Sequence, residues 1–251
     1  MNKSELKVVL ICGGKGTRVS ELTGAVSPKS LIRLSKKVSR PLVAYQLDQL
    51  KRAGVKSVLL VLENDWQVPI FKHSIRSGEF PGMNYSFSTC FTLHPFSIFS
   101  HPDITKFIGR SNFLVSYGDI YYSLDILGKM KKLLSRNNTS VACGMYSKSK
   151  RWRKGKKFIT FSKNNKGEVV NIGYSDKADF TIHAPFLFKH KALGTILRRA
   201  KLNSARTIPI LSDLIGTSNL SVVTPRRLVN LTTLQDAKNV EGAIREGHLN
   251  Q

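Results

Sequence analysis

The sequence predicts an α/β domain with a mixed β-sheet, and three observations carry this prediction. Short apolar runs typical of buried strands alternate with helical patterns along most of the 251 residues. A turn signal at residues 163–167 (KNNKG) separates two later strand-like runs, which predicts a β-hairpin. The composition is 41% hydrophobic and 22% charged, as in chains that fold around an apolar core.

Each expected element rests on its own pattern. The strands are short apolar runs bounded by turn residues, and the helices carry apolar residues at helical spacing. The first helix has Pro41 in its first turn and is followed by Gly54. In chain order we expect strands at 7–12, 57–62, 112–117, 140–146, 157–162, 168–173 and 181–188, and helices at 41–53, 123–135, 191–202 and 233–245.

The organisation of the chain predicts one domain in a reducing compartment. No linker, low-complexity tract or repeat interrupts the sequence, so we expect a single domain over residues 1–251. Neither a membrane-spanning apolar run nor a signal peptide is evident, which favours a cytoplasmic location. The three cysteines are widely separated, a spacing typical of neither a disulfide framework nor a zinc site.

Charge is the unusual property of this sequence. Forty Lys and Arg residues against 16 Asp and Glu give a formal net charge of +24. Such an excess attracts nucleic acid, acidic membranes or phosphorylated small molecules, although a general basic bias of the source would look the same. The densest cluster lies at residues 148–157, and we expect it to be an exposed, mostly solvated hairpin.

A glycine-rich loop follows the first expected strand directly. Its sequence is Gly13-Gly14-Lys15-Gly16-Thr17-Arg18. Glycines let backbone N–H groups approach a phosphate closely, because no Cβ intervenes. The spacing differs from a Walker A loop, and Val19 stands where a dinucleotide-binding loop has its third glycine. Taken alone, the loop is compatible with phosphate binding or with a structural turn that binds no ligand.

The segment after the loop distinguishes these alternatives. Pro28-Lys29 follows Arg18 by ten residues, and the combined pattern G-G-x-G-T-R…P-K resembles the sugar nucleotidyltransferases. Further segments resemble that family in the same order, from Val8 to about Ala243. They are Gly118-Asp119, Asp176-Lys177 and the stretch Asn230 to Asp236.

The resemblance implies both a fold and a reaction. The fold would be a Rossmann-like three-layer α/β/α sandwich with a mixed, mostly parallel sheet and a small β-hairpin elaboration on the acceptor side. The nucleotide-binding half would cover about 1–120 and the acceptor-binding half about 121–251. The reaction would transfer a nucleoside monophosphate from an NTP to a sugar 1-phosphate, releasing pyrophosphate and forming an NDP-sugar. Partners would be the NTP and a phosphorylated small-molecule acceptor, with no membrane. We do not expect nucleic-acid binding, although the net charge of +24 makes it possible. The sequence is also compatible with an oligomer.

The resemblance also implies a role for each matched residue. Arg18 and Lys29 would contact the reacting phosphates, Asp176 and Lys177 would bind the acceptor, and Mg²⁺ would be held by Asp119 and Asn230. The nucleotide would be bound by residues at the glycine-rich loop and by the glycine that follows the strand expected at 112–117. These residues are Cys12, Gly13, Gly14, Gly16, Thr17 and Gly118. The attacking phosphate is already an anion near neutral pH, so no general base is expected.

Departures from the family pattern keep two alternatives open. Asn230 stands where the family usually has a second Asp, and the base-reading Gln is missing around residues 90–96, where His94 replaces a glycine. One alternative is a cytidylyltransferase-type enzyme with a non-sugar phosphate or phosphonate acceptor. The other is a catalytically weak regulatory or nucleic-acid-associated relative. A glycosyltransferase is disfavoured, because Asp119-Ile120-Tyr121 lacks the required Asp-x-Asp.

Overall fold

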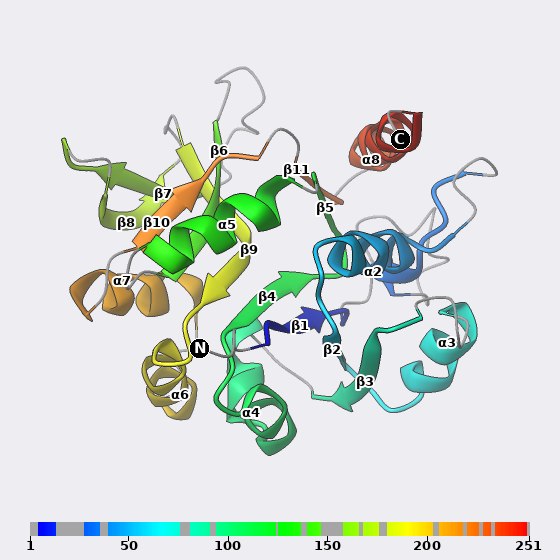
Figure 1. Ribbon diagram of the computed structural model, residues 1–251, viewed down its shortest axis with the longest axis horizontal. Helices are drawn as coiled ribbons and strands as arrows, with labels where there is room; N and C mark the ends of the chain where they lie inside the picture. Colours follow the sequence, from blue (N-terminus) through cyan, green and yellow to red (C-terminus); the bar gives the residue numbers. More distant parts are fainter. Residues whose placement is uncertain are drawn as a thin grey trace. The chain divides into compact units, whose positions relative to one another are not determined.

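The computed structural model describes most of the chain (Figure 1). The described residues are 5–13, 28–35, 40–75, 81–90, 94–123, 125–136, 140–146, 158–165, 168–175, 180–202, 206–217, 220–225, 228–231 and 234–249. Among these residues, no helix is long and apolar enough to cross a membrane.

A mixed β-sheet forms the centre of the α/β fold, which confirms the predicted fold class. Seven strands follow one another in the order β10-β6-β9-β4-β1-β2-β3, and the β7–β8 hairpin is attached to β9. Parallel pairs (β2 with β3, β6 with β10) and antiparallel pairs (β9 with β4 and β6) both occur. The strands are β1 (Lys7–Ile11), β2 (Ser57–Leu62), β3 (Asn84–Thr89), β4 (Phe113–Tyr117), β6 (Ser140–Tyr146), β7 (Phe158–Lys163), β8 (Val169–Ser175), β9 (Phe180–Phe188) and β10 (Leu220–Val223).

A second, two-stranded sheet is formed by segments far apart in the sequence. Strands β5 (Ile120–Tyr122) and β11 (Leu228–Asn230) pair antiparallel, with Asn230 opposite Ile120. The helices are η2 (Lys29–Leu31) and η3 (Pro95–Ser100), both 3₁₀, and α2 (Leu42–Arg52), α3 (Gln67–Ser74), α4 (Pro102–Ile108), α5 (Asp125–Arg136), α6 (Ala192–Lys201), α7 (Thr207–Thr217) and α8 (Leu234–Leu249).

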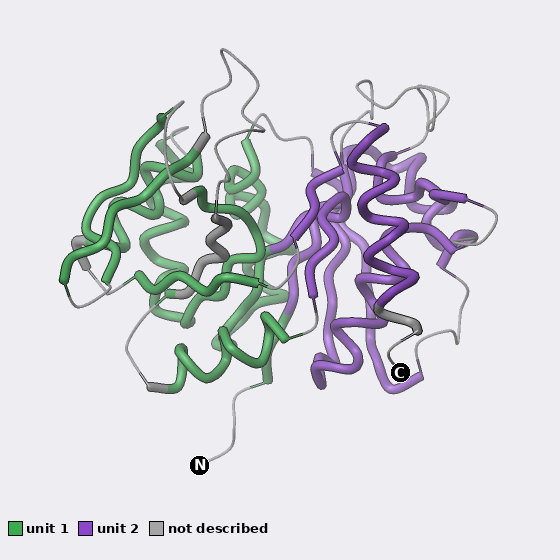
Figure 2. Tube along the Cα trace, turned by 90° about the horizontal axis from the view of Figure 1, so that it is seen from above, with its two compact units in different colours: residues 1–7, 92–115, 125–226 green, residues 8–91, 116–124, 227–251 purple. Residues whose placement is uncertain are grey.

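Two compact units share the chain (Figure 2). The first comprises residues 1–7, 92–115 and 125–226, and its core contains packed phenylalanine rings, with the Phe113 and Phe188 centroids 5.3 Å apart. The second comprises residues 8–91, 116–124 and 227–251. The three central residues of β1 and all but the first residue of β2 are buried in it. The expectation of one domain over 1–251 stays a prediction.

One apolar cluster organises the second unit. Helix α2 contributes Leu42 and Tyr45, and these side chains pack with Tyr121 of β5 and Leu231 beyond β11. Helix α8 completes the cluster with Ala237, Val240, Ala243 and Ile244. Burial of this apolar surface is the main force that holds such segments together. The cluster therefore draws together the segments that carry Lys29, Asp119 and Asn230.

Candidate active site

The start of the glycine loop lies at the end of β1, as the sequence predicts. The backbone N–H of Cys12 donates to the carbonyl of Val61 at 2.8 Å, so the residue after β1 still pairs with the end of β2. Gly13 faces Glu63, whose Cβ would lie 3.4 Å from an added side-chain carbon. The rest of the loop, including Gly14, Gly16, Thr17 and Arg18, lies outside the described residues.

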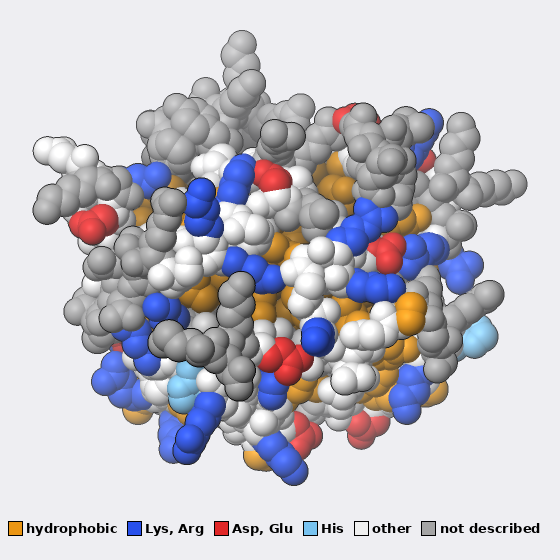
Figure 3. Space-filling view, viewed as in Figure 1, with side chains coloured by type: hydrophobic (Ala, Val, Ile, Leu, Met, Phe, Trp, Pro, Cys, Tyr) orange, Lys and Arg blue, Asp and Glu red, His pale blue; other side chains and the backbone are white. Residues whose placement is uncertain are grey.

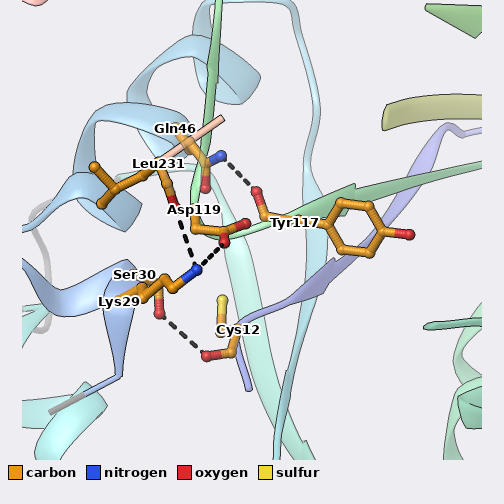
Figure 4. Close-up of polar contacts among 7 residues, drawn as sticks. All are labelled: Cys12, Lys29, Ser30, Gln46, Tyr117, Asp119 and Leu231. Atoms are coloured by element: carbon orange, nitrogen blue, oxygen red, sulfur yellow. Dashed lines mark hydrogen bonds and ion pairs between the residues drawn. The ribbon is translucent and has the colours of Figure 1, made fainter. Parts of the chain in front are cut away.

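Lys29 and Asp119 meet although they are 90 residues apart in the sequence (Figure 4). The ammonium Nζ of Lys29 lies 3.3 Å from Oδ2 of Asp119 and donates to the carbonyl of Leu231 at 3.2 Å. The two side chains are only 13% and 27% exposed. Solvent screens the attraction between a half-buried ammonium and carboxylate less than it screens a surface pair. The position of each group therefore depends on the position of the other.

The Gly118-Asp119 turn depends on close packing against the loop and η2. The N–H of Gly118 donates to the carbonyl of Ile11 at 2.7 Å. A Cβ on Gly118 would lie 2.7 Å from the Cβ of Ser30 and 2.8 Å from the Sγ of Cys12. Only glycine permits this approach. Asp119 directly precedes strand β5.

Cys12 is a packing residue with an inert thiol. Its side chain is buried, and Ser30 donates a hydrogen bond from Oγ to the Cys12 carbonyl at 3.2 Å. Burial raises the pKa of the thiol well above its ordinary value, so it stays protonated near neutral pH. Any contribution of Cys12 to nucleotide binding therefore comes from its backbone and its shape.

Asp119 and Asn230 lie on paired segments, and both carry side-chain oxygens of the kinds that bind Mg²⁺. Asn230 is opposite Ile120, and the N–H of Leu231 donates to the carbonyl of Asp119 at 2.9 Å. Carboxylate and amide oxygens are ligands that Mg²⁺ accepts, and it commonly takes one or two carboxylates together with substrate phosphates. The described residues contain no cluster of three His, Cys, Asp or Glu side chains. A carboxylate and an amide oxygen are chemically compatible with Mg²⁺, and substrate phosphates commonly supply its other ligands.

Several other residues predicted from the sequence lie outside the described part of the chain or away from Lys29 and Asp119 in the sequence. Asp176, Lys177 and the basic cluster at 148–157 lie outside the described residues. His94, which stands in place of the family's glycine, is half-buried. It precedes η3, and its ring Nε2 lies 3.4 Å from Nε of Arg206. Lys and Arg side chains lie scattered over the face shown in Figure 3, as the general charge excess suggests.

Gln46 has a structural role that the sequence analysis does not assign. It lies on α2 with no exposed surface, and its side-chain amide donates to the carbonyls of Tyr117 and Ile120 (Figure 4). These two residues flank Gly118-Asp119. The available signal was a polar side chain within a helical segment that is otherwise apolar on that face.

Comparison with known proteins identifies the family. The family model described as "Nucleotidyl transferase" matches residues 7–156, more than half of the chain, and the protein belongs to this family. The predicted relationship is thereby confirmed. A search of curated protein sequences found no significant match.

Solved structures of sugar-phosphate enzymes share the fold. A Bacillus anthracis protein, titled a glucose-1-phosphate thymidylyltransferase in complex with sucrose, matches with a TM-score of 0.74 at 14% identity over 94% of each chain. A UDP-glucose pyrophosphorylase complexed with UDP-glucose matches with a TM-score of 0.71 at 13% identity over 97% of this chain and 99% of that chain. A UTP-bound UGPase of Acinetobacter baumannii matches with a TM-score of 0.67 at 12% identity, covering 94% and 91%. At these identities the likeness concerns the fold.

Proposed function

We propose that this nucleotidyl transferase transfers a nucleoside monophosphate from an NTP to a sugar 1-phosphate. The observation that carries the proposal is the contact between Lys29 and Asp119, beside the strand end from which the glycine loop departs. A cation and a carboxylate at such a loop suit phosphate chemistry. The structural relatives titled with UTP, UDP-glucose and glucose 1-phosphate support this class of substrate.

The reaction needs positioning and charge neutralisation more than acid–base chemistry. A phosphate oxygen of the acceptor forms a bond to the α-phosphorus, and the bond from that phosphorus to the β-phosphate oxygen breaks. Pyrophosphate leaves with the bonding electron pair. Because the second pKa of a phosphomonoester is about 6, the attacking group is already an anion near neutral pH. No residue of the chain has to remove a proton.

The residues of the chain would divide this work among themselves. Amides of the loop that begins at Gly13 would bind the triphosphate, and Arg18 would form paired hydrogen bonds to a phosphate. Lys29 would place a point charge near the α-phosphate or the departing pyrophosphate. Asp176 and Lys177 would bind the acceptor.

Asp119 and Asn230 would hold Mg²⁺, which supplies further neutralisation of phosphate charge. Asn230 has no negative charge, so we expect weaker binding of the ion than with a pair of carboxylates. The carbonyl of Asp119 accepts from Leu231, which keeps the two ligand-bearing segments in register.

A pyrophosphate-release screen tests the proposal. ATP, CTP, GTP, UTP and dTTP are each combined with sugar 1-phosphates, phosphocholine and a phosphonate, in the presence of Mg²⁺. Release that requires a sugar 1-phosphate, and that is lost in Lys29→Ala, is the expected result. Release only with CTP and a non-sugar acceptor would establish the alternative acceptor class. No acceptor-dependent release from any NTP would overturn the enzymatic proposal.

A further inference from the structure

We propose that Gln46 of α2 is a positioning residue that fixes the Gly118-Asp119 turn and, through Asp119, the place of Lys29. Its effect on catalysis rests on the proposed function, whereas its effect on the turn does not. No matched motif includes Gln46, and the geometry alone assigns it this role.

The side-chain amide of Gln46 has one orientation that satisfies its surroundings. Nε2 donates to the carbonyl of Tyr117 at 2.7 Å and also to the carbonyl of Ile120. Both partners are acceptors, so the group between them must be the NH₂ of the amide. Its Oε1 is buried without a partner in the described part of the chain, which is uncommon for a buried polar atom. The side chain is therefore used for its two donors.

Helix α2 is held independently of these hydrogen bonds. Its first residue, Leu42, donates from its N–H to the carbonyl of Ile32 at 3.0 Å. Leu42 and Tyr45 are buried in the cluster with Tyr121 and Leu231. Because apolar packing holds the helix in place, the backbone of Gln46 has a fixed position from which its side-chain amide donates.

The backbone of the turn is tied to three separate segments. The Gly118 N–H donates to Ile11 of β1, and the Asp119 carbonyl accepts from Leu231. The side-chain amide of Gln46 donates to the carbonyls of the residues on either side of this dipeptide. Among these ties it is the one made by a side chain, so a substitution can remove it without altering the chain path. Without it, two carbonyls lose a donor, and we expect the turn to loosen.

The experiment compares Gln46→Met with Gln49→Met. Both substitutions replace a glutamine of α2 by an unbranched side chain of similar size, but Gln49 makes no side-chain hydrogen bond to the turn. Amide hydrogen exchange is measured over residues 117–122, together with kcat and KM for the NTP. We expect exchange in Gln46→Met to be at least about tenfold faster. We also expect kcat to fall by about 10²-fold, the loss that an error of about 1 Å in placement can produce, with KM changing less than about threefold.

The control separates positioning from general damage to the helix. Gln49→Met should keep wild-type exchange and kcat. Unchanged exchange and kcat in Gln46→Met, or an equal loss in both variants, would overturn the proposal. If Gln46→Met does not fold, Gln46→Asn, which keeps a donor on a shorter side chain, is measured instead, and the same outcomes apply to it.

Failure of the proposed function gives a different result. In that case the wild-type protein releases no pyrophosphate, and the exchange measurement alone decides. Faster exchange at 117–122 in Gln46→Met but not in Gln49→Met would then still support the role of Gln46 in fixing the turn.

Discussion

Gly118→Ala tests the tightest contact of the candidate site. The new Cβ would lie 2.7 Å from the Cβ of Ser30 and 2.8 Å from the Sγ of Cys12, both well inside van der Waals distance. Ser30 and Cys12 are each only 2% exposed, so neither has room to move aside. Gly118 does not have a positive φ, and the cost is therefore steric rather than a matter of backbone conformation.

The expected loss of stability follows from two opposing effects. Overpacking of a well-packed site costs about 1–3 kcal/mol. Replacing glycine by alanine recovers about 0.4–1 kcal/mol by restricting the unfolded chain. We expect a net destabilisation of about 1–2 kcal/mol, which lowers the urea midpoint by about 0.5–1 M for a denaturant slope near 2 kcal/mol/M.

Urea unfolding followed by circular dichroism measures the loss, and Gly242→Ala is the matched control. A Cβ on Gly242, in α8, meets no atom within 4 Å, so that substitution should be neutral or stabilising by up to about 1 kcal/mol. The Gly118 variant should also lose most of its pyrophosphate release, because Asp119 must shift with the turn. Wild-type stability and activity in Gly118→Ala would refute the steric reasoning.

Four further predictions concern the charged pair and the buried thiol. Lys29→Ala should lower kcat by roughly 10²-fold or more, with a much smaller change in the urea midpoint, because its charge acts where negative charge develops; wild-type pyrophosphate release would contradict this. Asp119→Ala, or excess EDTA with the wild-type protein, should abolish activity, and full activity in EDTA would exclude a metal-dependent reaction. Cys12 should resist alkylation near pH 8 in the folded protein and react in urea, as mass-spectrometric mapping would show. Because burial raises the folded pKa of this thiol, the wild-type protein should lose stability as pH rises above about 9, the ordinary thiol value, and Cys12→Ala should lose less.

The strands that bury both faces could be predicted from the sequence. The expected strand at 57–62 is confirmed to the residue, because SVLLVL is a continuous apolar run with almost every side chain buried. Strand β3 was missed, since Asn84–Thr89 has no apolar run and only Ser88 of its six residues is buried. Helix α7 was missed for the opposite reason. Its sequence, TIPILSDLIGT, is apolar on many sides and shows no single stripe.

The candidate site was predictable in its parts and not in its assembly. The motifs Pro28-Lys29 and Gly118-Asp119 indicated these residues. Proline and glycine each impose or permit a particular backbone conformation, so they are recognisable in a short sequence motif. The contact between Lys29 and Asp119 spans 90 residues and arises only when α2, β5 and β11 pack together. Strands β5 and β11 have three residues each, too few for a periodic pattern. The sequence marks Gln46 only as a polar residue on an apolar helical face, and its two acceptors are known only from the structure.

The pairing of Lys29 with Asp119 explains how opposite charges can be kept in a half-buried site before any substrate arrives. Each group partly neutralises the charge of the other at 3.3 Å. An NTP and its cation carry the same two signs, so a phosphate can replace the carboxylate beside Lys29 while a cation replaces the ammonium beside Asp119. Neither group would pass through a state without a partner. On this reasoning Lys29→Ala harms the site twice, because it removes both a phosphate contact and the ammonium that lies 3.3 Å from the Asp119 carboxylate.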